Sequence, residues 1–475
     1  MRNDNAQATA LYRLLWRWHF YAGLLVIPLM VLLASTGAVY LFKPQLDQWQ
    51  EREYRALPVA GEVSPDAQLQ AALAAYPGAT FHSYRLPEAP GDAAMIHLAL
   101  PGRAMRDVFV SPQGKVLGSR DPETLISEVV QKLHGQLLLG HPGSWVVEIA
   151  ASWAIVLILS GLYLWWPRGR GLAGVLYPRL GSGGRLFWRD LHAVGGFWVS
   201  ALALVLLFTG LPWAHAWGSA FKAVRAELGW VKGAEDWTIG GTPVGDPHAE
   251  HDHAAMMAGM DHAAMGHTGM AHIGADHAAM GHGGMGHGAM APVRLSEMVA
   301  KARGERLAFP VLVTPPGGPA RFGRKGSASW TVRSDSANRP LRVTITYDAM
   351  TGRELAREGQ ADKHVIDRVL AYGIAWHEGQ LLGWINQLIG LLTAVILVVL
   401  PVSGFVMWRR RKPQGQLGAP PLPPVKARIG VIAAVLGVLM VLLPLLTLSL
   451  LAMILIDALI VSRIARLSRW LGTAQ

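Results

Sequence analysis

The pattern of apolar and polar positions divides the chain into long apolar stretches joined by polar connections. Each stretch has about 20 residues or more and almost no charge, which lets a helix cross roughly 30 Å of hydrocarbon at about 1.5 Å per residue. Four core spans and a C-terminal apolar segment therefore predict a membrane protein of the α-helical class. The stretches cover about residues 18–42, 144–166, 191–214, 381–408 and 429–461.

The last stretch allows two arrangements. Its 33 residues suit one long tilted span or a hairpin that turns near Pro444. Arg463, Arg466 and Arg469 follow it and favour a return to the cytoplasm. The hairpin is preferred, and the single span stays open.

The two long connections predict two small α+β modules. Each has a short helical pattern, then runs rich in β-branched and aromatic residues, then a turn. The helices cover 64–76 and 294–303, and the strands lie near 79–86, 94–100, 107–110, 309–314, 328–334 and 341–347.

Charge sets the expected topology. The net charge is +11, but Lys and Arg gather beside the span ends and not on one soluble face, so we expect no nucleic-acid partner. Five arginines in 167–190 and six basic residues in 409–428 place these loops in the cytoplasm. The N-terminus is then cytoplasmic, the first span is a retained signal anchor, and the large loops face the periplasm across a bacterial inner membrane. The chain has no cysteine, so redox chemistry needs other ligands.

These observations predict nine segments. They are the N-terminus with the first span 1–43, an outer module 44–132, the second span 133–166, a cytoplasmic loop 167–190, the third span 191–214, a second outer module 215–376 with an insertion 248–290, the fourth span 377–408, a cytoplasmic loop 409–428 and the C-terminal segment 429–475.

The chain repeats a unit of span, module and span. His19 and His192 match, because each has a glycine four residues later and a Thr-Gly pair whose glycine follows by 18 residues. His134 and His377 match too, each followed 27 residues later by the glycine of a Ser-Gly pair. Shared offsets of this kind indicate a duplicated unit.

The repeated motifs carry a resemblance to a known family. An RxxWR run before a His, LHG or WHEG, SGxxxW and a D-x-x-T-G-like turn together resemble the PepSY-associated transmembrane family over about residues 10–410. Its members include inner-membrane reductases of ferric siderophores. The resemblance implies four core spans, two periplasmic PepSY-like modules, and b-type heme held by histidines of the spans.

The four matched histidines lie at two expected depths. A His in hydrocarbon is costly and is therefore a functional candidate. His19 and His192 lie near the cytoplasmic ends of their spans, and His134 and His377 near the outer ends. Two matched helices can clamp one heme iron, so two hemes with two axial histidines each are expected. For a single His the alternative is an interfacial side chain bonded to a carbonyl.

Other residues near these histidines have weaker roles. His141 and His215 are alternate heme ligands, since neither has a matching His in the other half. Gly23 and Gly196 suit either a flat macrocycle or close helix packing. Arg13, Arg17, Arg185 and Arg189 suit heme propionates or the positive-inside pattern. No catalytic side chain is assigned.

The insertion 248–290 contains nine His and eight Met set in Gly and Ala. Its low apolar bulk predicts a disordered loop. Thioether and imidazole ligands suit copper better than iron, magnesium or calcium, although an incidental linker or a zinc or nickel buffer stays open. The candidate metal ligands are His248, His251, His253, Met256, Met257, Met260, His262, Met265, His267, Met270, His272, His277, Met280, His282, Met285, His287 and Met290.

The leading hypothesis is a heme-dependent metal reductase that conducts electrons across the membrane. The acceptor is periplasmic Cu(II) or a ferric siderophore, with copper preferred. The chain has no dinucleotide fingerprint, so the donor is external, a membrane quinol or a reduced flavin. Alternatives are a copper buffer without redox activity, a transporter subunit or a protease regulator. A transporter is disfavoured because the apolar centres of the core spans hold no Asp, Glu, Lys or Arg.

Overall fold

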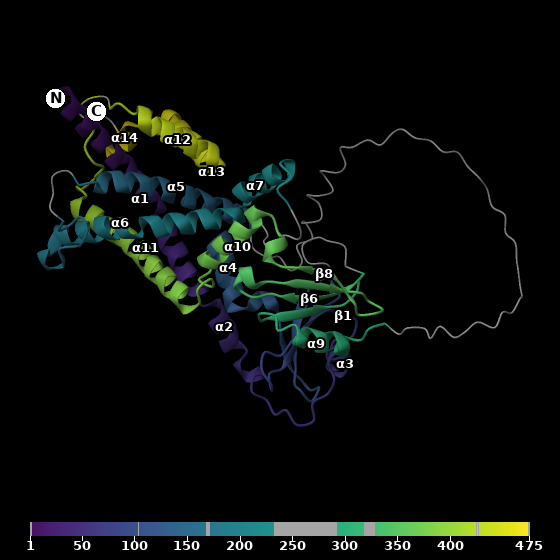
Figure 1. The fold of residues 1–475 in the computed structure, drawn as a ribbon. Helices are drawn as coiled ribbons and strands as arrows, with labels where there is room; N and C mark the ends of the chain where they lie inside the picture. Colours follow the sequence, from purple (N-terminus) through teal and green to yellow (C-terminus); the bar gives the residue numbers. More distant parts are fainter. Residues whose placement is uncertain are drawn as a thin grey trace, which may run out of the picture.

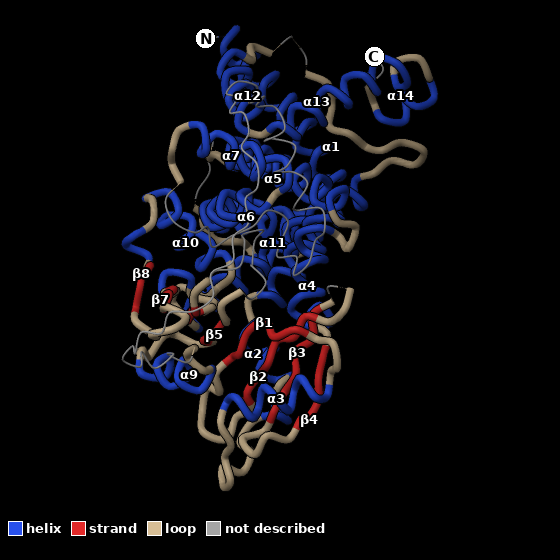
Figure 2. The backbone as a smooth tube through the Cα atoms, turned by 90° about the vertical axis from the view of Figure 1, so that its right-hand side faces the viewer, coloured by secondary structure: helices blue, strands red, loops and turns tan. Residues whose placement is uncertain are grey.

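The computed structural model describes residues 2–473 apart from 103, 168–171, 232–291, 318–327, 424 and 426. It joins a bundle of long helices to one antiparallel sheet (Figures 1 and 2). The helices are α1 (Arg2–Tyr40), α2 (Lys43–Gln50), α3 (Pro65–Ala75), α4 (Ile126–Gln136), α5 (His141–Trp165), α6 (Gly184–Gly210), α7 (His215–Glu227), α9 (Leu295–Gly304), α10 (Val365–His377), α11 (Trp384–Arg411), α12 (Gly430–Leu442), α13 (Pro444–Ile456) and α14 (Ala465–Leu471).

Five of the described helices are long and apolar enough to cross a membrane. They cover Gln7–Tyr40, His141–Trp165, Gly184–Trp213, Trp384–Arg411 and Pro444–Val461. The protein is therefore a multi-pass membrane protein of the helical class. Within the bundle α1, α5, α6 and α11 pack around one another, and α13 lies against α5.

The C-terminal apolar segment forms a hairpin. α12 ends before Leu443, and Pro444 opens α13, as expected of a residue that suits the first helical turn. Both ends of the segment return to α1, because the Arg428 N–H donates to Gln7 at 3.1 Å and Arg17 donates to the Gly472 carbonyl at 2.9 Å. The turn lies at the other end, where Trp217 of α7 donates to the Leu442 carbonyl.

The two α+β regions form a single sheet and not two separate modules. Eight strands lie in the order β4-β3-β2-β1-β5-β6-β7-β8. They are β1 (Thr80–Arg85), β2 (Ala94–Ala99), β3 (Met105–Val110), β4 (Val116–Arg120), β5 (Val311–Thr314), β6 (Trp330–Ser334), β7 (Thr344–Tyr347) and β8 (Glu354–Glu358). β1 and β5 join the halves through the pairs Tyr84↔Val313 and Arg85↔Leu312. The sequence indicates six of these strands, but pairing between modules depends on tertiary contact, which no local pattern reveals.

The sheet buries one apolar face under α3 and α9. Ser64 caps α3 by accepting from the Ala67 N–H, and Pro65 occupies the first turn. Ala72 of α3 and Met298 of α9 are fully buried with Ile96 and Val332 of the strands in one shared core. The sheet and its two helices thus share one core beside the bundle.

Candidate functional site

Four histidines form two facing pairs inside the bundle. The distal pair, farther from the sheet, is His19 of α1 and His192 of α6, with ring centres 6.2 Å apart. The sheet-side pair is His134 of α4 and His377 of α10, with ring centres 6.4 Å apart. Each pair joins one residue from each half of the chain, as the repeat predicts. The sheet-side histidines lie on short helices that precede α5 and α11, and not on the long helices themselves.

Each histidine is held at Nδ1 by a hydroxyl of a neighbouring helix. The distances from Nδ1 to the hydroxyl oxygen lie between 2.9 and 3.2 Å. The pairs are His19 with Ser160, His134 with Thr36, His192 with Ser403 and His377 with Thr209. A backbone carbonyl three residues before each hydroxyl accepts from the same ring, that of Leu157, Leu33, Leu400 or Leu206.

These contacts fix the tautomer of all four rings. Each hydroxyl already donates its proton to a carbonyl of its own helix, so toward the ring it acts as an acceptor. A carbonyl can only accept. Nδ1 must therefore carry the hydrogen, and Nε2 keeps a lone pair for a metal.

A glycine next to each hydroxyl lets the ring approach the facing helix. A Cβ added at Gly37, Gly161 or Gly210 would lie 3.2 to 3.3 Å from Cε1 of His134, His19 or His377, and one at Gly404 would lie 3.5 Å from Cε1 of His192. The Thr-Gly and Ser-Gly pairs thus act alike. In each, the hydroxyl orients the imidazole and the glycine leaves space for it. Sequence spacing identifies these dipeptides but does not reveal which ring each one holds.

The four histidines line one cavity of about 1010 Å³. This is at the upper limit of about 300–1,000 Å³ that is usual for small-molecule sites. Gly23 and Gly196 also line it, and their added Cβ atoms would meet only leucine side chains at 3.8 and 3.6 Å. The cavity therefore extends along both pairs, and beside the distal pair its lining includes two glycines, which add no side chain to it.

This geometry lies within a region that one family model describes. The model of the PepSY-associated TM region matches residues 16–411, which include all four histidines. The chain belongs to this family. A search of the curated proteins finds no match.

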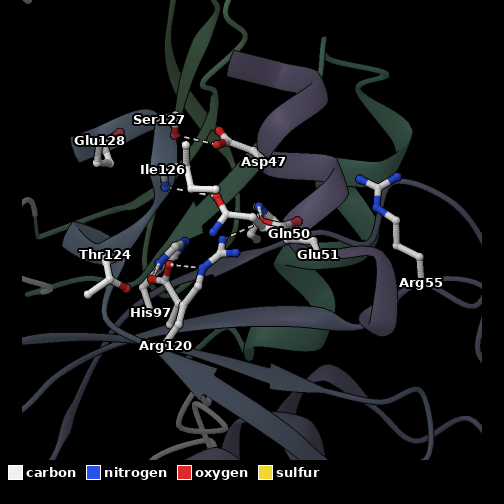
Figure 3. A network of polar contacts seen from close by, with 12 residues as sticks. Asp47, Gln50, Glu51, Arg55, His97, Arg120, Thr124, Ile126, Ser127 and Glu128 are labelled. Carbon is white, nitrogen blue, oxygen red and sulfur yellow. Dashed lines mark hydrogen bonds and ion pairs between the residues drawn. The ribbon is translucent and has the colours of Figure 1, made fainter. Parts of the chain in front are cut away.

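In this PepSY-associated TM protein, polar contacts fix α4, the helix of His134 (Figure 3). At the start of α4, the Ile126 N–H donates to Gln50 at 3.1 Å and Ser127 donates to Asp47 at 2.5 Å. Glu51, which ends α2, binds Arg85 of β1 and Arg120 of β4. α4 is thereby linked through α2 to the sheet.

A buried ion pair fixes α10 in the other half. Arg225 of α7 donates to both carboxylate oxygens of Asp367 at 2.7 Å, and the Arg225 side chain is fully buried. The Trp213 ring lies 5.7 Å from the His377 imidazole, and Arg339 lies over the same indole. Trp213, Tyr40 and Glu378 line both the cavity and a second pocket of about 540 Å³ on the sheet side.

Arginines reach the distal end of the cavity. Arg185, Arg189 and Arg411 line it. Arg13 and Arg17 instead donate to carbonyls of the C-terminal region, those of Leu422 and Gly472. Arg411 was not singled out by the sequence pattern, since it reads as one more basic residue at a span end.

The alternate ligands His141 and His215 contact each other and belong to neither pair. The two Nδ1 atoms are 3.0 Å apart and both rings line the cavity. The proposed copper ligands in 248–290 lie outside the described residues.

Proposed function

We propose that this chain is a two-heme transmembrane electron conduit that reduces a metal in the periplasm, Cu(II) or a ferric siderophore. The supporting observation is that all four histidines have the same tautomer. In each, Nδ1 gives its hydrogen to a neighbouring helix, and Nε2 is left as a ligand inside the cavity.

The ring separations fit one iron in each pair. The two imidazoles of each pair could hold one metal ion between them, because a metal–nitrogen bond of about 2 Å and roughly 1.1 Å from nitrogen to ring centre add to about 3.1 Å on each side. The observed separations are 6.2 and 6.4 Å. Heme bound there would supply one-electron transfer with two neutral nitrogen ligands. Arg185 and Arg411 would neutralise acidic groups of the macrocycle at the distal end.

The proposal includes the topology and the duplication. Four core spans in two repeated units would hold the distal pair near the cytoplasm and the sheet-side pair near the periplasm, where the sheet domain lies. The basic loops beside α5 and α11 favour this orientation. An external quinol or reduced flavin would deliver electrons at the distal side.

Two features favour different acceptors. The pocket beyond Trp213 is lined by charged side chains of both signs, among them Lys43, Arg85 and Asp335, which suits a polar ferric chelate. The His and Met residues of 248–290 suit copper, because the soft thioether favours Cu(I). The tract also supports a second candidate, a copper buffer without redox activity.

Removal of 248–290 tests the choice of acceptor. The deleted protein should keep both hemes and show the sharp reduced α-band of the intact protein, since the four histidines and the hydroxyl groups that orient them are all outside residues 248–290 of the sequence. After anaerobic reduction, oxidation by low Cu(II) should be several-fold slower than in the intact protein, because the tract raises the local metal concentration. A ferric chelate should oxidise both proteins at similar rates. An absent α-band in the intact protein would refute the conduit. Equal rates of oxidation by Cu(II) in the intact and the deleted protein would show that the tract plays no part in copper reduction.

A further inference from the structure

His141 and His215 form a third histidine pair of a different kind. They open α5 and α7, and a hydrogen bond joins their Nδ1 atoms at 3.0 Å, with ring centres 4.2 Å apart. Both Nδ1 atoms become available to one ion when each ring carries its hydrogen at Nε2. His141 is exposed and His215 half-buried, so the pair lies at the surface as well as at the cavity wall. Its sequence position links it to the sheet-side pair, because His141 follows His134 by seven residues and His215 follows Trp213 by two.

The duplicated architecture shows that the fold does not require this pair. At the matching positions of the other half are Trp384, which opens α11, and Phe42, which precedes α2. Two apolar aromatics therefore stand at the matching positions of the sequence. The two imidazoles occur in one half alone, so the repeated fold does not account for them and a binding role would.

The spacing fits a metal ion bound by both rings. A metal at about 2.05 Å from two nitrogens that are 3.0 Å apart has a nitrogen–metal–nitrogen angle of about 94°. This is the angle between neighbouring ligands in a square-planar or tetragonal site, the geometry that Cu(II) prefers with nitrogen and oxygen ligands. Among the described residues no group of three or more His, Asp or Glu side chains is placed to hold a metal. The remaining positions would thus belong to water or incoming ligands, and the ion could exchange.

A carboxylate offsets the partial positive charge at the N-terminus of α7, which would otherwise repel a bound cation. The Glu148 carboxylate, two turns along α5 from His141, accepts from the backbone N–H groups of Ala216 and Trp217 at 3.0 to 3.3 Å. Ser144 accepts from the His215 N–H at 3.2 Å. The matching residues in the other half are Leu391 and Gln387, so the carboxylate accompanies the two histidines.

We propose that Nδ1 of His141 and Nδ1 of His215 bind Cu(II) at the sheet-side mouth of the cavity. In the context of the proposed function, on which this role rests, the site holds the acceptor beside the sheet-side pair. Each Cu(II) takes one electron and leaves as Cu(I). An external quinol supplies two electrons for two ions and releases two protons.

The test measures binding without electron flow. The parent protein is the oxidised chain from which only residues 248–290 are deleted. It is titrated with Cu(II) and followed by electron paramagnetic resonance, which resolves nitrogen coupling from imidazole ligands. The variant His141→Trp/His215→Phe carries the residues of the matching positions. The variant His141→Gln/His215→Gln keeps polar side chains there, and His82→Ala removes a histidine outside the cavity as the matched control.

We expect one Cu(II) with two nitrogen ligands in the parent and in His82→Ala, and a loss of affinity of at least about 10-fold in both double variants. Heme content should be the same in all four proteins. Equal copper affinity in parent and double variants would overturn the proposal. Loss of heme from both double variants would also overturn it, since the histidines would then serve the heme site. Intact copper binding without oxidation of the reduced protein would refute the conduit and leave the copper site standing.

Discussion

The distal and sheet-side histidine pairs share one local design but are supported differently. In both, a hydroxyl and a carbonyl orient the imidazole and a glycine gives it room. The distal histidines are part of the long helices α1 and α6, so apolar packing of the bundle holds them. The sheet-side histidines sit on α4 and α10, which are fixed by charged and polar contacts to α2, α7 and the sheet. The two pairs thus have the same ring geometry although different contacts hold their helices, and only the sheet-side pair should respond to changes in the sheet domain.

Removal of single histidines should have the largest effect. If each pair holds one heme, as proposed, His19→Ala or His192→Ala should lose the distal heme and keep the other, and His134→Ala or His377→Ala should do the reverse. Heme per protein, measured as pyridine hemochrome, should fall from two to about one in every variant. Full heme content in all four variants would show that other residues are the ligands.

Breaking the buried ion pair should affect the sheet-side pair alone. Asp367→Ala leaves Arg225 charged and buried, which costs about 3–5 kcal/mol and frees α10 with His377. Thermal unfolding should shift down, and the sheet-side heme should be lost first as the temperature rises. The double variant Arg225→Met/Asp367→Leu should recover most of the stability, because no unpaired charge remains. Equal loss of both hemes in Asp367→Ala would contradict the separate supports.

Among these changes, a lower pH should have the smallest effect on heme retention, and it should act first on the sheet-side pair. Burial opposes ionisation of Glu51, but Arg85 and Arg120 outweigh it and lower its pKa. For Asp107 burial likewise acts against ionisation, and His97 and Arg120 outweigh it and lower the pKa.

A carboxylate whose pKa is lowered in the folded state stabilises that state above its unfolded pKa and loses this contribution as the pH falls through the folded value. The support of α4 should therefore be complete above about pH 5 and weaken below about pH 4. In a pH titration followed by the α-bands, the sheet-side heme should leave before the distal heme. In Glu51→Gln this difference between the hemes should shrink. Release of both hemes at one pH would argue against a link between the sheet and the pair.

Much of the architecture can be predicted because it has local or periodic signals. The long helices follow from apolar length, and the four histidines follow from repeated offsets. Strands β1, β2, β3, β5, β6 and β7 lie where the runs of β-branched and aromatic residues predict them, whereas for β4 and β8 the sequence marks only the preceding turn. The family match over residues 16–411 confirms the resemblance carried by the same motifs.

Contacts between distant segments could not be predicted. The hydroxyl of Ser160 reaches His19 only because α1 and α5 pack side by side, and the single sheet exists only because β1 meets β5. Glu148 lies in the first turns of a span, but its role at the start of α7 depends on how the two helices meet. His141 and His215 are 74 residues apart and have no counterpart in the repeat, so no spacing rule connects them.

The joint between β1 and β5 also bears on how the chain is made. During synthesis β1 is an unpaired edge on its β5 side until residues near Val313 appear, 229 residues after its partner Tyr84. Contacts at such separation close slowly, and an open strand edge invites pairing with other chains. Residues of α5, α6 and α7 are synthesised in that interval, whereas α10 and α11 follow β5, so three of the four core bundle helices precede the closure of the sheet. A truncated chain that ends before β5 should expose this edge and aggregate through it.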